Sequence, residues 1–200
     1  MKLIRKEILI DQGNFRSTLE YKGIEADISA AIARVVWPIG ASTFTIYPER
    51  NANGVVPIKK AFLAHLENQG WGLENRLDVG AVQKRPGAID ATKQIGSQYF
   101  AVEWETGNIS SSHRALNKIA IGMLRGVLVG GTLILPTSSL YTYLTDRVGN
   151  FGELEPYFDV WRSLNLTHSV GTLSVIAVEH DATSEAVEKI AKGTDGRALI

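Results

Sequence analysis

Three carboxylates are spaced as they would be in a site that binds a metal ion. Glu103 and Glu105 stand two residues apart in an alternating segment, and Asp90 precedes the pair by thirteen residues. Glutamates at this spacing on a strand project from the same face, about 7 Å apart. Like charges at close range raise each other's pKa unless a cation neutralises them. With hard oxygen donors and no histidine or cysteine nearby, the pattern favours Mg²⁺ over Zn²⁺.

The acidic pair also has a simpler interpretation. A strand with one charged face is most often exposed to solvent, since charged side chains are seldom buried. Asp90 follows P-G-A-I, where Gly87 permits a tight bend, so this carboxylate could start or end a neighbouring strand. Glu74, in L-E-N-R-L-D, is a possible fourth carboxylate. The carboxylates alone leave both the metal site and the exposed strand open.

The segments around these carboxylates alternate between helix and strand. Apolar side chains recur at helical spacing in residues 24–36, 58–66, 116–127, 140–144 and 154–161. Strand-like composition marks residues 43–47, 100–105, 132–135 and 172–178. The hydroxyls of residues 110–112 could cap the third helix. This order predicts an α/β fold with a central mixed β-sheet flanked by helices.

Composition limits the class of protein. The chain has 200 residues, 44% hydrophobic and 21% charged, which suits a single domain with a substantial core. Without cysteine it can form neither disulfides nor a thiolate metal site. Its 21 basic and 21 acidic side chains balance, so nucleic acid would need a local basic patch. The apolar runs are too short for a signal peptide or a membrane span, and we expect a cytoplasmic protein.

Seven blocks of sequence resemble the BamHI family of type II restriction endonucleases, in the same order and at similar spacing. They are W-P with T-F-T-I (residues 37–46), N-G-V-V-P-I-K (53–59), P-G-A-I-D (86–90), E-W-E-T-G-N-I-S-S-S-H-R (103–114), Y-L-T-D-R-V (143–148), N-F-G-E-L-E-P-Y-F (150–158) and K-G-T-D-G (192–196). The blocks span about four fifths of the chain, and we place no similarity before Trp37. The resemblance implies a restriction-endonuclease-like core.

The resemblance also implies an activity, that of a type II site-specific deoxyribonuclease. The enzyme would hydrolyse double-stranded DNA at the palindrome GGATCC, between the two guanines, leaving 5′ overhangs. The cofactor would be Mg²⁺, about two ions to each active site. A palindromic site implies a homodimer whose subunits each cut one strand. A cognate methyltransferase would act on the same DNA without needing to bind the enzyme. The alternatives are a related endonuclease with a different site, or a sequence-specific DNA-binding protein that does not cut.

Catalytic roles follow from the same resemblance. Asp90, Glu103 and the backbone carbonyl of Trp104 would hold Mg²⁺, and Glu74 would be a further acidic residue of this site. Glu105 would help to activate the attacking water, because a carboxylate can accept its proton.

The resemblance assigns DNA contacts as well. The residues expected in the major groove are Asn108, Ser110, Arg114, Asp146 and Arg147. Their types suit the task, because arginine can donate twice to guanine and aspartate can accept from the cytosine amino group. Lys59 would lie near the DNA backbone, although a lysine in this position is as often merely solvated.

Two further expectations concern a C-terminal arm and the contacts of the dimer. The chain ends four residues after K-G-T-D-G, and we expect residues 192–200, with Gly193 and Asp195, to form a C-terminal arm that contacts the minor groove. This arm would be the last part of a single endonuclease domain of residues 1–200. The family resemblance places dimer contacts on two helices, with Ile119, Met123, Leu124, Phe158 and Trp161.

Overall fold

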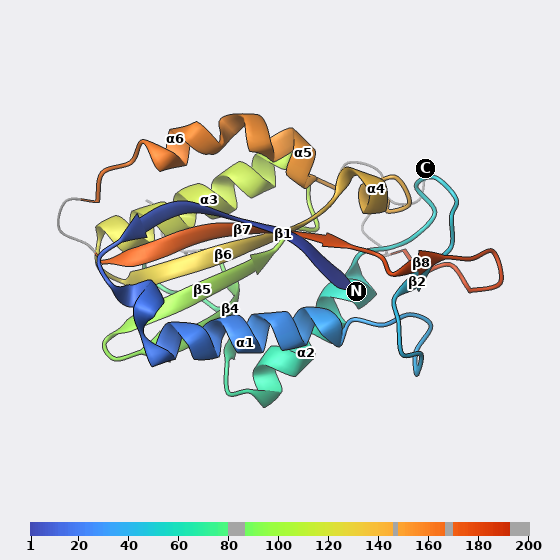
Figure 1. The fold of residues 1–200 in the computed structure, drawn as a ribbon, viewed down its shortest axis with the longest axis horizontal. Coiled ribbons are helices and arrows are strands. Elements are labelled where there is room, and N and C mark those ends of the chain that lie inside the picture. Colours follow the sequence, from blue (N-terminus) through green and yellow to red (C-terminus); the bar gives the residue numbers. More distant parts are fainter. Residues whose placement is uncertain (80–86, 146–147, 167–169, 193–200) are drawn as a thin grey trace.

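The computed structural model describes residues 1–79, 87–145, 148–166 and 170–192 (Figure 1). Four of the expected DNA-contacting residues lie outside this part of the chain: Asp146, Arg147, Gly193 and Asp195. Within it, no helix is both long enough and apolar enough to cross a membrane.

A six-stranded mixed sheet forms the centre of the described structure (Figure 1). Its strands are β1 (Lys2–Gln12), β3 (Gly72–Asn75), β4 (Ile89–Ile95), β5 (Gln98–Trp104), β6 (Leu128–Pro136) and β7 (Gly171–Glu179). They are ordered β1-β7-β6-β5-β4-β3, with β5, β6 and β7 parallel and the outer pairings antiparallel. The expected central mixed sheet is confirmed.

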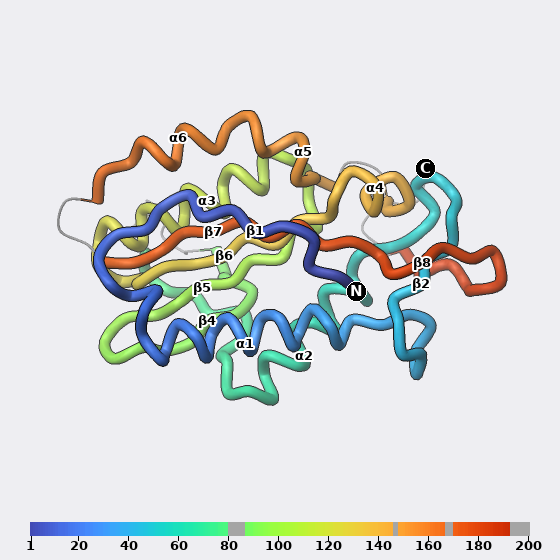
Figure 2. The backbone as a smooth tube through the Cα atoms, viewed as in Figure 1, coloured from blue at the N-terminus to red at the C-terminus, as the bar shows by residue number. Residues whose placement is uncertain are grey.

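Helices cover both faces of this sheet (Figure 2). On one face lie α1 (Leu19–Ala33) and α2 (Val56–Asn68), and on the other α3 (Ile109–Leu124), α5 (Phe151–Leu154) and α6 (Phe158–Arg162). Each face has its own hydrophobic core. All of β6 is buried, as expected for a parallel strand covered on both sides. The helices therefore hold the central strands rigidly, and the ends of β4 and β5 can support a site.

The edge strand β1 is absent from the sequence-based expectations. Its first four residues are exposed and include Lys2 and Arg5, so the strand has little of the apolar alternation that marks a half-buried strand. Charged residues are common on edge strands, where they discourage pairing with another chain. The strand conformation of β1 is instead stabilised by its antiparallel pairing with β7.

Several predicted elements differ in extent from the observed ones. The strand expected at residues 43–47 is only β2 (Thr45–Ile46), which pairs with β8 (Ala182–Thr183) outside the central sheet. The short helix expected at 140–144 is α4 (Ser138–Tyr141). The single helix expected at 154–161 is wrong. A 3₁₀ turn at Glu155–Tyr157 separates α5 from α6, because Pro156 cannot continue a regular α-helix. A second 3₁₀ turn, Phe15–Ser17, precedes α1.

The expected dimer residues are mostly part of the core. Ile119, Met123, Phe158 and Trp161 are almost fully buried within the chain, so they cannot form a surface for a second subunit. For these four residues the expectation is wrong, since the inward stripe of each helix packs on the sheet. Leu124 is 54% exposed and remains a candidate.

Candidate active site

Asp90 and Glu103 meet where β4 begins and β5 ends. The strands pair with Ala91 opposite Val102, which puts Asp90 and Glu103 at the next position of the ladder. The backbone N–H of Asp90 donates a 3.3 Å hydrogen bond to Glu103 Oε2, and the N–H of Trp104 donates one of 2.8 Å to Asp90 Oδ2. The strand pairing thus brings the two carboxylates into one site, as their sequence context suggested.

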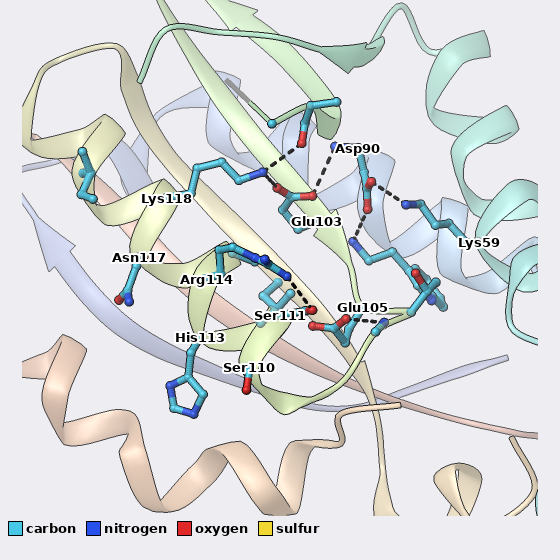
Figure 3. Close-up of a pocket in the computed structure, with 18 residues that line it drawn as sticks. Lys59, Asp90, Glu103, Glu105, Ser110, Ser111, His113, Arg114, Asn117 and Lys118 are labelled. Carbon is cyan, nitrogen blue, oxygen red and sulfur yellow. Dashed lines mark hydrogen bonds and ion pairs between the residues drawn. The ribbon is translucent and has the colours of Figure 1, made fainter. Parts of the chain in front are cut away.

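The carboxylates are not on a solvated face. Asp90, Glu103 and Glu105 are only 7%, 8% and 6% exposed. All three line a cavity of about 780 Å³ together with residues from α2 and α3 (Figure 3). The interpretation as an ordinary exposed strand is therefore wrong. Burial of several carboxylates is unfavourable unless cations or hydrogen bonds compensate for the loss of water.

Two lysines from opposite sides of the sheet neutralise the first two carboxylates (Figure 3). Lys59 on α2 places Nζ 2.5 Å from Asp90 Oδ1. Lys118 on α3 forms an ion pair with Glu103 Oε1 and donates a hydrogen bond, 2.9 Å long, to the carbonyl of Ala88. Lys118 was not expected in this site from the sequence. Its one signal is the four-residue spacing from Arg114, which puts both on the same side of α3.

Glu103 has a buried carboxylate oxygen, Oε1, that forms an ion pair with Lys118. Burial raises the pKa of its carboxyl, Lys118 acts in the opposite direction, and the negative charge of Asp90 raises it again. Among the described residues, buried Oε1 has no hydrogen-bond partner of normal geometry; its contact is the ion pair with Lys118. A buried oxygen in this state suits a hard cation.

The donor set fits Mg²⁺ in particular. No three His, Asp or Glu side chains gather as ligands in the described ranges, so a cation in this cavity would have few protein ligands, with Asp90 and Glu103 as the paired carboxylates. Mg²⁺ commonly binds through one or two carboxylates and completes its shell with water and substrate phosphate.

Glu105 is held by a different set of donors. Ser112 Oγ donates to its Oε2 and the backbone N–H of Gly107 donates to its Oε1, both over 2.6 Å. Burial raises the pKa of Glu105, while these hydrogen bonds lower it. Ser112 was expected among the hydroxyls that cap α3, but the cap is Asn108, whose Oδ1 accepts from the N–H of Ser111. Ser112 is fully buried and orients Glu105 instead.

The start of α3 presents polar side chains beside the carboxylates. Ser110 and Arg114 are exposed and line the same cavity, with Arg114 donating over 2.9 Å to Ser111 Oγ. Asn108 lines a different hollow of about 640 Å³, which Arg50 also lines. One continuous segment, from Glu103 to Arg114, therefore carries both acidic and potential base-reading groups.

The structure does not bring Glu74 into the cavity. The pairings of Leu73 with Ala91 and of Asn75 with Ile89 place the backbone of Glu74 beside Asp90. However, its φ of 50° is in the left-handed region, its side chain is exposed, and it does not line the cavity. A ligand role for Glu74 remains a prediction without support from its observed position.

The arrangement of strands and helices is that of a restriction endonuclease. The fold is similar to that of restriction endonuclease BglII in complex with a DNA 16-mer, with a TM-score of 0.57 over 94% of this chain and 88% of that one. Free BglII matches with a TM-score of 0.52 over 89% and 81%. Sequence identity is 8% in both cases, so this likeness concerns the fold alone.

Sequence comparison identifies the family. The profile described as "Restriction endonuclease BamHI" matches residues 1–197. Type II restriction enzyme OkrAI of Oceanobacter kriegii is 51% identical over 199 residues, covering 100% of both chains. Type II restriction enzyme BamHI of Bacillus amyloliquefaciens is 37% identical over 177 residues, covering 85% of this chain and 80% of its own. The chain belongs to the BamHI family of restriction endonucleases, which are site-specific deoxyribonucleases.

The family match corrects one expectation about the N-terminal segment. We placed no similarity before Trp37, but the family match begins at residue 1. The early segment forms β1 and α1, whose roles in the sheet and core impose few specific residue types.

Proposed function

We propose that this enzyme cuts both strands of duplex DNA at GGATCC, between the two guanines, and leaves 5′ overhangs with Mg²⁺ as cofactor. The observation that carries the proposal is the shared cavity of about 780 Å³, in which buried Asp90, Glu103 and Glu105 adjoin exposed Ser110 and Arg114. A nuclease needs acidic groups beside the scissile phosphate and donors within reach of the bases, and this cavity offers both.

The acidic residues divide the chemistry between them. Asp90, Glu103 and the carbonyl of Trp104 would hold Mg²⁺, about two ions per site, and the bound metal would supply positive charge for the phosphate and lower the pKa of water. Glu105 accepts the proton of the attacking water, since a carboxylate within reach can act as the general base. Ser112 and Gly107 support this role by fixing both oxygens of Glu105.

Base reading belongs to the start of α3 and to the segment that contains Asp146 and Arg147. The described neighbours of that segment support this assignment, because the N–H of Gly149 donates to the carbonyl of Gly107 over 2.7 Å. Asn108, Ser110 and Arg114 contact bases in the major groove, while Asp146 and Arg147 read guanine-cytosine pairs. Lys59 contacts the DNA backbone, and the arm with Gly193 and Asp195 enters the minor groove.

A palindromic target requires a homodimer with two-fold symmetry. Exposed apolar side chains on adjacent elements offer a surface for it: Leu124 on α3, Tyr157 in the 3₁₀ turn and Val160 on α6. Nε1 of Trp161 donates a 3.0 Å hydrogen bond to Asn117 Oδ1, and this contact holds α6 against α3. In the cytoplasm, a companion methyltransferase would protect the same site in the host DNA.

Plasmid digestion tests this function. A plasmid with one GGATCC site should become linear in Mg²⁺ and stay intact with EDTA, and religation should show four-base overhangs, as staggered cutting of this palindrome requires. Glu103→Ala should bind the site without cutting it. Cutting at another sequence would favour the related endonuclease and reject the GGATCC assignment alone. Binding without any cutting by the unaltered protein would reject the nuclease function.

A further inference from the structure

Lys118 lies between the buried carboxylates of the cavity and the side of α3 that carries Arg114. Its ammonium reaches Glu103 and the carbonyl of Ala88, while its backbone lies one helical turn after Arg114 (Figure 3). Both side chains line the cavity. Lysine has a flexible four-carbon stem and three donors, so its ammonium can exchange one anionic partner for another without movement of the helix.

The pairing with Glu103 competes directly with a bound cation. Glu103 Oε1 is buried and forms an ion pair with Lys118. A divalent cation bound to that oxygen would therefore lie close to the Lys118 ammonium. Two positive charges at such close range repel each other, which makes this contact unfavourable. Lys118 must then leave Glu103 while its charge remains inside the cavity. A DNA phosphate, which the proposed substrate brings into this cavity, is the anion that can accept it.

We propose that Lys118 couples metal binding to DNA binding: its ammonium neutralises Glu103 in the metal-free enzyme and passes to a DNA phosphate when a divalent cation takes Glu103. The inference rests on the proposed function. Coupling of this kind is reciprocal, because whatever raises the affinity for DNA when metal is bound must raise the affinity for metal when DNA is bound. Lys118 is thus a positioning and phosphate-binding residue of the cleavage site.

The first test measures binding rather than cleavage. Ca²⁺ has the same preference for oxygen ligands, and its affinity for DNA-free protein is measured by titration calorimetry. Lys118→Met should bind Ca²⁺ about five- to tenfold more tightly than the unaltered protein, because the competing ammonium is gone. Lys22→Met, an exposed lysine on α1 across the sheet, is the matched control and should leave the affinity unchanged. Equal Ca²⁺ affinities for the Lys118 variant and the unaltered protein would overturn the proposal.

The second test follows DNA binding by fluorescence anisotropy of a labelled GGATCC duplex, with the duplex checked for cleavage. In Ca²⁺, Lys118→Met should lower the slope of log affinity against log salt by about 0.9, the value for one phosphate contact. Without Ca²⁺, the slopes of variant and unaltered protein should agree, since Lys118 is then paired with Glu103. A slope that differs equally in both conditions would overturn the exchange of partners.

A double-mutant cycle in metal-free buffer covers the case in which Lys118→Met folds poorly. Glu103→Gln should release Lys118 and increase metal-free affinity for DNA about tenfold, a gain within the usual range of coupling factors. In a Lys118→Gln background, the same change should give a much smaller gain. Equal gains in both backgrounds would mean that only repulsion by Glu103 was relieved, which contradicts the proposal. Plasmid cleavage by the unaltered enzyme tests the proposed function separately.

Discussion

Ser112 Oγ donates a 2.6 Å hydrogen bond to Glu105 Oε2, which links the first turn of α3 to the end of the acidic strand β5. Both groups are buried. Rotation of the Glu105 carboxylate would therefore break a buried hydrogen bond, at a cost of about 1–3 kcal/mol. Together with the N–H of Gly107, Ser112 therefore fixes the orientation of the Glu105 carboxylate, the proposed proton acceptor.

Ser112→Ala should slow cleavage while DNA binding persists. Loss of the donor leaves Glu105 less well oriented, and the rate of plasmid cleavage at saturating enzyme should fall by about tenfold to a hundredfold. Affinity for the GGATCC duplex should stay within a factor of about two, because Ser112 is fully buried and is not among the proposed DNA contacts.

Two controls accompany this measurement. Ser139→Ala removes an exposed hydroxyl on α4 and should leave the rate unchanged. In a Glu105→Gln background, Ser112→Ala should cause little further loss, since residues that act together are not additive. Equal losses in both backgrounds would show that Ser112 acts independently of Glu105.

The main elements around the site follow from local patterns. The alternation of Phe100, Val102 and Trp104 with acidic residues predicts β5, and the spacing of Leu116 and Ile119 predicts α3. These signals are strong because each element packs an apolar face against the sheet. Gly87 indicated a bend after which Asp90 could start a strand, and the observed β4 begins at Ile89.

Other parts of the site depend on contacts between distant segments. Lys118 lies on the polar side of α3, where a lysine is usually solvated, and its pairing depends on how α3 crosses β5. From the sequence, Ser112 was expected among the residues that cap α3, but in the structure the cap is Asn108. For Glu74, the observed left-handed backbone conformation changes the direction of the side chain in a way that sequence cannot indicate.

Arg147→Ala should relax discrimination at a guanine. The loss of a bidentate contact is expected to reduce the preference for GGATCC over a duplex with one altered guanine pair by about 1–3 kcal/mol. Competition binding of the two duplexes in Ca²⁺ measures this difference. An equal loss of affinity for GGATCC and for random DNA would contradict base reading by Arg147.

Lys59→Ala should affect all DNA sequences alike. If Lys59 contacts a backbone phosphate, its removal lowers the salt slope of binding by about 0.9 without changing the preference for GGATCC. The ion pair with Asp90 adds a second consequence, because Asp90 loses a partner 2.5 Å away. Thermal unfolding without divalent cations should therefore occur at a lower temperature, and added Ca²⁺ should recover part of the difference. An unchanged salt slope would remove Lys59 from the DNA contacts.

Leu124→Glu should weaken the homodimer. Leu124 and Val160 are 54% and 58% exposed, and a charge in an apolar contact between subunits would be buried without a partner. Sedimentation velocity at low micromolar protein should detect monomer, and plasmid cleavage should accumulate nicked circles because single subunits cut one strand. Ile39→Glu alters an equally apolar residue that is 90% exposed elsewhere and should leave the dimer intact. A Leu124 variant with the sedimentation of the unaltered protein would exclude this surface.

Removal of residues 192–200 should weaken specific binding without unfolding the protein. Two residues before the removed segment, Ile190 is buried; its N–H donates a 3.1 Å hydrogen bond to Asn53 Oδ1, and its carbonyl accepts one of 2.9 Å from the N–H of Gly54. Truncation after Ala191 leaves these contacts intact, so the thermal unfolding temperature should change little. If the removed residues contact the minor groove, affinity for GGATCC should fall about tenfold or more, the cost of one or two lost contacts. Identical affinities of the truncated and full chains for GGATCC would rule out the arm.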